Sequence, residues 1–354
     1  MKKVGIMSMQ RIVNYGSFLQ SYGLKKIIEA MGENEVQFVD YTYESPLNID
    51  SEKRLACLKR KLSPNYLPGK IFTQKCAVQL KKDLKTIGVD KPNFHANVDT
   101  LVIGSDEVFN CLQGYPVGYS RELFGKNYED KKVISYAASF GYTTLSALKK
   151  YDIESEVRVL LSKFAAISVR DHNAREVIKS LTGRNALLHF DPVLIYDFDQ
   201  ELKWDTNKQE SYIVVYAYTN RLNSEEEKYI KAFARKHNKK IYSIGNYSRI
   251  ADKNIICNPL EVFSYFKGAD FVITDTFHGT IFSVKTNSRF CTIIRESNKN
   301  KLIALLQLLD REDRIVNSME DIESLYMIDI DFRHTNEILE YEKMRTIEYL
   351  KENL

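Results

Sequence analysis

Short apolar runs of strand length alternate along the chain with longer stretches whose apolar residues lie three and four positions apart. This pattern predicts strands that alternate with amphipathic helices. In the first half, a helix that starts near Asn14 ends at Gly32, a residue type suited to the left-handed turn that closes helices. The other elements predicted here are strands at 4–9, 35–41, 100–106, 132–141, 164–171 and 186–191, and helices at 145–162 and 173–182.

The same alternation begins again after a polar stretch that follows Asp191-Pro192 and runs to Ser211. In this second half, Asn223 or Ser224 is the expected cap of a helix whose first turn is acidic. The elements predicted here are strands at 211–219, 239–245, 270–276 and 289–294, and helices at 223–238, 259–269, 278–288, 298–310 and 335–354. We therefore predict an α/β protein of two Rossmann-like, doubly wound domains with a central cleft.

The predicted domain limits follow from the polar stretch between the two halves. They are 1–195 for the first domain, 196–332 for the second and 333–354 for a closing helix. With 354 residues, two domains agree with the usual domain size.

Composition narrows the class of protein further. No apolar run approaches the roughly 18–20 residues that a membrane span needs. The five cysteines are scattered without CxxC spacing, which argues against a disulfide framework or a zinc knuckle and fits a reducing, cytoplasmic location. The total charge of +4 is uneven, because residues 53–85 hold ten Lys or Arg and a single acid, Asp83. The basicity is thus local, and we expect no nucleic-acid partner.

The basic segment 53–85 leaves two interpretations open. A basic amphipathic helix can lie on an anionic membrane surface, which would give peripheral membrane contact. The same composition also fits a solvated helical hairpin.

Candidate chemistry is expected where parallel strands end, because ligands of such sheets bind at the carboxyl edge. Asp106, at the end of the strand 100–106, can orient a hydroxyl or take its proton, or it can simply cap a following turn. Arg170, at the end of a buried strand, either binds an anion or pairs with a nearby aspartate. Asn14 can cap the first helix, with Tyr15 packed beside it, or both can contact a ligand.

The most informative local feature is TDTFHGT (274–280), which places a histidine at a strand-to-helix turn. His278 there can act as a general acid or base near neutral pH, although a lone histidine is usually structural. Gly279 would let the backbone approach a ligand closely. The chain lacks a GxGxxG after its first strand, and GxSxG, HExxH and Walker sequences. We expect neither a metal nor a cofactor.

Several segments, in order and at their spacing, resemble the polysaccharide pyruvyl transferase family from Val4 to about Arg314. They are NYGSFLQSYGL, GSDEVFN, SYAASFG, ISVRD, DPV and DFVITDTFHGTIFSVKTNSRF. The resemblance implies a fold like that of GT-B glycosyltransferases, with the closing helix crossing back to the first domain. It also implies transfer of a pyruvyl group from phosphoenolpyruvate to two hydroxyls of a sugar. The product would be a cyclic ketal on a cell-surface polysaccharide, such as a capsule or exopolysaccharide, or on its precursor.

The resemblance also implies roles for individual residues. His278 matches the family's cleft histidine, and Arg170 matches an arginine that binds the anionic donor. Many members carry arginine two residues before the histidine, where this chain has Thr276, and Arg295 or the N–H groups of the following helix could compensate. Asp106 would position the sugar. Further substrate contacts are expected from Asn14, Tyr15, Gln20, Asn110 and Gly279.

Two other functions stay open on the same architecture. One is a nucleotide-sugar glycosyltransferase, and the other is a non-catalytic sugar-binding relative, suggested by Thr276. The expected partners are phosphoenolpyruvate and a sugar acceptor that could be lipid-linked, which would bring the protein to the inner face of the membrane.

Overall fold

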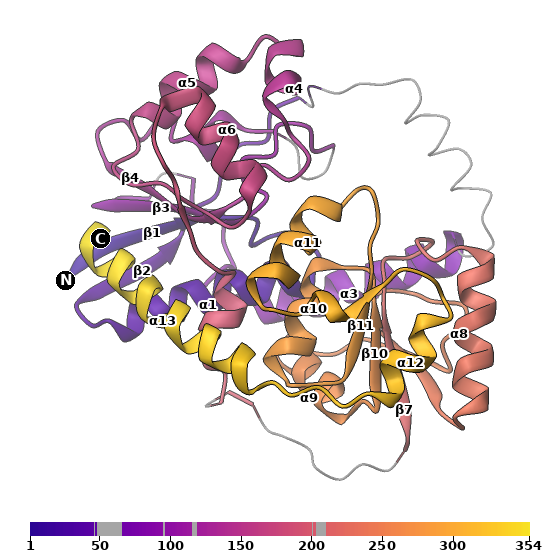
Figure 1. Ribbon diagram of the computed structural model, residues 1–354. Coiled ribbons are helices and arrows are strands. Elements are labelled where there is room, and N and C mark those ends of the chain that lie inside the picture. The colour runs from indigo at the N-terminus through magenta and orange to yellow at the C-terminus, as the bar shows by residue number, and fades with distance from the viewer. Residues whose placement is uncertain (46, 48–65, 95, 115–118, 200, 203–209) are drawn as a thin grey trace.

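The computed structural model describes residues 1–45, 47, 66–94, 96–114, 119–199, 201–202 and 210–354. It contains two six-stranded sheets, and all strand pairs within each sheet are parallel. Helices surround both sheets (Figure 1). This confirms the predicted α/β class with two doubly wound, Rossmann-like halves.

The first sheet has the strand order β2-β1-β3-β4-β5-β6. Its strands are β1 (Lys2–Met7), β2 (Asn34–Phe38), β3 (Thr100–Asp106), β4 (Lys132–Ala138), β5 (Ser168–Val169) and β6 (Leu187–Leu188). The helices of this half are α1 (Tyr15–Ala30), α3 (Tyr66–Thr86), α4 (Leu145–Lys150), α5 (Glu154–Ser162), α6 (His172–Thr182) and α7 (Pro192–Ile195), with a short 3₁₀ turn η1 (Arg121–Phe124).

The second sheet has the order β12-β11-β10-β7-β8-β9. Its strands are β7 (Tyr212–Tyr216), β8 (Lys240–Ile244), β9 (Lys253–Ile255), β10 (Phe271–Thr274), β11 (Phe290–Ile293) and β12 (Ile315–Val316). The other elements are α8 (Ser224–Lys236), α9 (Glu261–Gly268), α10 (Phe277–Lys285), α11 (Lys299–Leu308), the 3₁₀ turn η2 (Glu312–Arg314), α12 (Asp321–Met327) and α13 (Arg333–Asn353).

Several predicted elements differ from the observed ones. The single helix predicted over 145–162 is two helices, α4 and α5, because Asp152 between them has a left-handed backbone conformation with φ of 54°. The strands predicted at 164–171 and 186–191 pair over only two residues each. By contrast, Asn223 caps α8 as expected, in a reciprocal capping box with Glu226.

The core follows the alternation of side chains along the strands. Leu101 and Ile103 of β3 pack on one face of the first sheet, while Val102 packs on the other. The second sheet alternates in the same way. The face that holds Val102 and the face that holds Val214 of β7 belong to one apolar cluster, so a single core extends across both halves.

Helix α13 runs from the second half back along the first sheet (Figure 1). Its Tyr349 hydroxyl donates to the carbonyl oxygen of Ser135 at 2.7 Å, and its Thr346 hydroxyl lies 3.1 Å from that of Tyr136. Both partners belong to β4. The last helix is therefore fastened to the first sheet, although it follows the second in sequence.

Part of the predicted basic segment, 53–65, lies outside the described residues. The remainder forms α3, which packs against the second half: the Phe72 and Tyr247 rings are 6.3 Å apart, and Asn258 donates to Asp83 at 2.7 Å. No helix among the described residues is long and apolar enough to cross a bilayer.

Candidate active site

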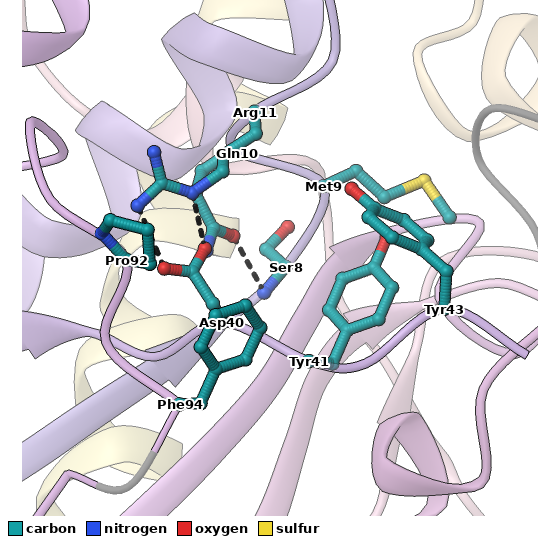
Figure 2. Close-up of a pocket in the computed structure, with 9 residues that line it drawn as sticks. All are labelled: Ser8, Met9, Gln10, Arg11, Asp40, Tyr41, Tyr43, Pro92 and Phe94. Carbon is teal, nitrogen blue, oxygen red and sulfur yellow. Dashed lines mark hydrogen bonds and ion pairs between the residues drawn. The ribbon is translucent and has the colours of Figure 1, made fainter.

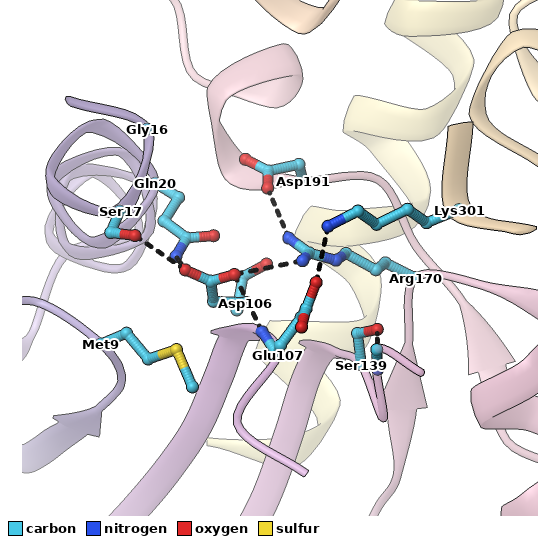
Figure 3. Close-up of polar contacts among 12 residues, drawn as sticks. Met9, Gly16, Ser17, Gln20, Asp106, Glu107, Ser139, Arg170, Asp191 and Lys301 are labelled. Carbon is cyan, nitrogen blue, oxygen red and sulfur yellow. Dashed lines mark hydrogen bonds and ion pairs between the residues drawn. The ribbon is translucent and has the colours of Figure 1, made fainter. Parts of the chain in front are cut away.

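A buried group of charged side chains forms where the carboxyl edges of the two sheets face each other (Figure 3). Asp106 at the end of β3 accepts hydrogen bonds from Ser17 Oγ at 2.9 Å and Gln20 Nε2 at 2.6 Å, both on α1. Its other oxygen lies 3.1 Å from Nη2 of Arg170. Burial alone would raise the pKa of Asp106, but Arg170 and then His278 outweigh it and lower that pKa to about 2. The carboxylate is therefore ionised at neutral pH.

Arg170 connects two carboxylates. Its Nη1 lies 3.1 Å from Asp191 Oδ2, while Nη2 binds Asp106, and only 2% of the side chain is exposed. Burial would lower the pKa of Arg170, but Asp106 and Asp191 raise it. The guanidinium also lies 4.5 Å from the ring centroid of Phe277, the first residue of α10.

His278 enters this group from the opposite half. It lies in the first turn of α10, and its Nε2 is 3.5 Å from Asp191 Oδ2. That buried nitrogen has no hydrogen-bond partner among the described residues. The imidazole lies against Gly16 of α1, where a Cβ would come within 2.1 Å of the ring. Only glycine at that position leaves room for the histidine.

A second ion pair joins the two halves nearby. Lys301 Nζ on α11 lies 2.6 Å from Glu107 Oε1, in the residue that follows Asp106 (Figure 3). Burial would raise the pKa of Glu107, but Lys301 lowers it. Lys301 also lies 5.8 Å from the ring centroid of Phe277, so this ring contacts two cations.

Three predicted substrate contacts border this group. Asn14 caps α1 and accepts from the Gly16 N–H at 2.7 Å, while its Nδ2 donates to the Tyr218 hydroxyl at 3.3 Å. Tyr15 is buried between the halves, and its hydroxyl accepts from the Cys257 N–H at 3.2 Å. Asn110 donates to Glu107 Oε2 at 2.7 Å.

Other predicted residues have structural partners of their own. Thr276, at the position of the family's arginine, caps α10 by accepting from the Gly279 N–H at 2.9 Å. A Cβ on Gly279 would lie 2.1 Å from the Thr274 hydroxyl, so the packing of the chain itself requires glycine there, and a ligand contact at Gly279 stays a prediction. Arg295 makes ion pairs with Glu226 at 2.6 Å and Asp275 at 3.1 Å. That Thr276 or Arg295 contacts the donor stays a prediction.

A hollow of about 100 Å³ lies between the two halves beside Asn14 and Tyr218. It is lined by Val13, Asn14, Tyr15, Cys76, Leu80, Tyr216, Tyr218, Gly245 and Asn246. No group of three or more His, Cys, Asp or Glu side chains placed to hold a metal ion occurs in the described part of the chain.

Sequence reasoning missed four members of the site. Ser17 and Glu107 lie within the motifs NYGSFLQSYGL and GSDEVFN, but no feature of their local sequence indicates a role in the site. The sequence leaves open which nearby aspartate pairs with Arg170, and the structure shows Asp191 in that place beside Asp106. Lys301 lies on an ordinary amphipathic helix, and only the tertiary structure brings it to Glu107.

Solved structures with this fold include sugar-nucleotide enzymes and glycosyltransferases, which identifies the architecture as GT-B-like. The Staphylococcus aureus MnaA–UDP co-structure has a TM-score of 0.51 at 12% identity, covering 100% of this chain and 98% of that one. The glycotransferase of kitacinnamycin has a TM-score of 0.52 at 9% identity, with 100% and 99% covered. The Methanocaldococcus jannaschii UDP-GlcNAc 2-epimerase with UDP-GlcNAc and UDP has a TM-score of 0.50 at 11% identity, with 99% and 100% covered. At these identities the likeness concerns the fold alone.

Within this architecture, the sequence itself defines the family. The model of the family described as polysaccharide pyruvyl transferase matches residues 14–297, which is most of the chain. The chain therefore belongs to the polysaccharide pyruvyl transferase family, as its motifs predict. No curated protein matches it.

Proposed function

We propose that this protein transfers the pyruvyl group of phosphoenolpyruvate to two hydroxyls of a sugar and forms a cyclic ketal. The observation that carries the proposal is the buried group in which Arg170, Lys301 and His278 gather from both halves. Phosphoenolpyruvate bears a carboxylate and a phosphate, and guanidinium and ammonium groups are the usual partners of such anions. Membership of a polysaccharide pyruvyl transferase family supports a saccharide acceptor.

Donor binding would exchange one set of ion pairs for another. The guanidinium of Arg170 pairs with Asp106 and Asp191, and Lys301 pairs with Glu107. An entering phosphate or carboxylate would compete with these groups in a site where burial strengthens electrostatic interactions.

Proton transfer is assigned to His278. It gives a proton to the methylene carbon of the donor, which leaves a cation at C2, and a sugar hydroxyl attacks C2 while the imidazole takes its proton back. Phosphate then leaves with the electrons of its C–O bond. The second hydroxyl adds to C2 and its proton departs with the phosphate, so the products are the ketal and inorganic phosphate.

Asp106 is better suited to orientation than to proton transfer. A carboxylate with a pKa of about 2 is a poor base near neutral pH, but it accepts hydrogen bonds well. In the proposal it fixes a sugar hydroxyl, with Asn14 and Asn110 beside it.

Calorimetric titration with phosphoenolpyruvate tests the donor assignment. The wild type should bind it, and Lys301→Met should weaken binding by roughly tenfold, because a charge-assisted contact of a partly buried ammonium is lost. Lys299→Met, on the same helix but more exposed, is the matched control and should bind as the wild type does.

The titration also separates the alternatives. Binding of a nucleotide sugar without binding of phosphoenolpyruvate would favour a glycosyltransferase. Binding of sugars alone would favour a non-catalytic relative. Equal affinities of the Lys301 and Lys299 variants would contradict the role given to Lys301.

We also propose that α3 brings the protein to the inner face of the membrane, where a lipid-linked acceptor would lie. Its outward residues include Leu67, which is 63% exposed, and Val78, which is 61% exposed. The exposed lysines are Lys70, Lys75, Lys81, Lys82 and Lys85. Their spacing places them with Leu67 and Val78 on the side of α3 that faces away from the second half, where lysines can attract anionic headgroups and the two apolar side chains can enter the membrane surface.

A further inference from the structure

An aromatic pocket lies beside the candidate active site, at the carboxyl ends of β1 and β2 (Figure 2). It has a volume of about 130 Å³. Its lining residues are Ser8, Met9, Gln10, Arg11, Asp40, Tyr41, Tyr43, Pro92 and Phe94. It adjoins an open depression of about 680 Å³ that shares Tyr41, Tyr43, Pro92 and Phe94. Together they form one groove with an aromatic wall.

The charges of this pocket neutralise each other. Arg11 binds Asp40 through two nitrogens, with Nε 2.5 Å and Nη2 2.7 Å from the two carboxylate oxygens (Figure 2). Asp40 also accepts from the Asn93 N–H at 2.8 Å. Because Arg11 and Asp40 cancel each other, the lining residues of the pocket carry no net charge, and this favours a neutral ligand over an anion.

The aromatic wall suits the faces of sugar rings. Tyr43 is 49% exposed and Phe94 is 43% exposed, so both rings present large surfaces to a ligand. Tyr41 packs edge-on against Tyr43, with ring centroids 5.0 Å apart, so the two rings form one continuous wall. A ligand with C–H faces would cover these rings, while its hydroxyl groups could bond the polar residues of the lining.

The position of the pocket relates it to the reacting centre. Strand β1 pairs with β2 on one side and with β3 on the other, so Asp106 lies two strands away at the same edge, about 10 Å at the usual strand spacing. Met9 lies beside the tyrosines in Figure 2, and its sulfur is 4.0 Å from the amide of Gln113, which also donates to the carbonyl oxygen of Glu107 at 2.9 Å. The Ser8 hydroxyl donates to the carbonyl oxygen of Ser105 at 2.9 Å. A disaccharide spans this separation.

We propose that the pocket formed by Tyr41, Tyr43 and Phe94 binds a second, non-reacting neutral sugar residue of the acceptor while the first lies at Asp106. This inference rests on the proposed function, which places the reacting sugar there. It names the acceptor class as an oligosaccharide rather than a single sugar.

Saturation-transfer NMR with neutral saccharides and no phosphoenolpyruvate tests the pocket. The probes are the methyl glycosides of glucose, galactose and mannose, and the disaccharides cellobiose, lactose, N-acetyllactosamine and chitobiose. At least one disaccharide should bind more tightly than every methyl glycoside. Tyr43→Ala or Phe94→Ala should weaken the binding of that disaccharide by roughly tenfold, since an aromatic contact is lost.

Tyr341→Ala is the matched control, because Tyr341 is a 59% exposed tyrosine on α13. It should leave saccharide binding unchanged. Each replaced ring is exposed, so the variants should fold, and an unchanged melting temperature would verify this.

Three results would overturn the inference. They are no saturation transfer to any saccharide, disaccharide binding that survives both ring removals, and binding of free UDP that disappears in Tyr43→Ala. The last would assign the pocket to a nucleotide. Since no donor is present, loss of phosphoenolpyruvate binding in the earlier titration and loss of saccharide binding here are separate outcomes.

Discussion

The ionised form of Asp106 contributes to the free energy of unfolding. Burial acts against the carboxylate, but Arg170 and then His278 favour it, and they lower its pKa from the ordinary 3.8 to about 2. Because the folded-state pKa lies below the unfolded one, this contribution is present above about pH 4 and is lost as the pH falls toward 2.

Asp106→Asn should therefore lower the free energy of unfolding at pH 7 by about 2 kcal/mol, and the difference from the wild type should shrink between pH 4 and pH 2. Urea unfolding at pH 7 and pH 3 measures this. Asp329→Asn replaces a fully exposed aspartate and serves as the control. A difference that stays constant with pH would show that the charge of Asp106 is not its source.

At this scale the sequence indicates the strand-end residues but not their partners. Asp106 and Arg170 lie at the ends of predicted strands, His278 follows another, and the structure brings the three together. Lys301 could not be found this way, because a lysine on an amphipathic helix has no local mark of burial. Arg295 pairs with Glu226 and Asp275, which come from other elements. The sequence does not predict these two pairings either.

The order of the strands explains where the site forms. In the second sheet, β7 and β10 are neighbours whose crossovers leave in opposite directions, and in the first sheet β1 and β3 have this relation. A crevice opens at such a point because the connections on its two sides diverge. Asp106 ends β3 and His278 follows β10, so the candidate site lies where the two crevices meet.

Alternating patterns predict the elements well, but they do not predict where an element is interrupted or how far strands pair. The break between α4 and α5 occurs at Asp152 without a proline or glycine. Strands β5 and β6 lie within longer apolar runs but pair over two residues each, because pairing length depends on the neighbouring strand.

Helix α3 makes the membrane proposal testable. Replacing Leu67, Ile71 and Val78 together with serine should reduce cosedimentation with vesicles containing anionic lipid by roughly tenfold, since their exposed apolar surface would no longer enter the bilayer. The matched control replaces Val159 of α5, which is 57% exposed, with serine. Equal cosedimentation of both variants and the wild type, or none for the wild type, would contradict the proposal.

At the scale of the whole molecule, α13 and the shared core join the two halves. With 21 residues the helix is about 30 Å long, which is enough to extend from the second half along the first sheet. Tyr349 packs with its ring centroid 4.9 Å from that of His189, in addition to its bond to Ser135. An amphipathic pattern predicts such a helix, but only the tertiary structure shows which sheet it covers.

Tyr349→Ala should reduce the free energy of unfolding by about 3–5 kcal/mol, because it leaves a cavity and an unpaired carbonyl in the first sheet. Urea denaturation followed by circular dichroism measures it. Tyr341→Ala, on the exposed side of the same helix, should cost less than about 0.5 kcal/mol. Similar losses for the two variants would show that α13 is not fastened through Tyr349.

The contact between Gly16 and the His278 ring has an evolutionary consequence. Every missense change of a glycine codon adds at least one carbon, and here that carbon would occupy the space of an imidazole carried by the other half of the chain. Gly16 and His278 are 262 positions apart in the sequence, yet relatives should conserve the two residues together. A lineage that loses the histidine is released from the glycine, so substitutions at position 16 among relatives should mark those in which this imidazole no longer serves.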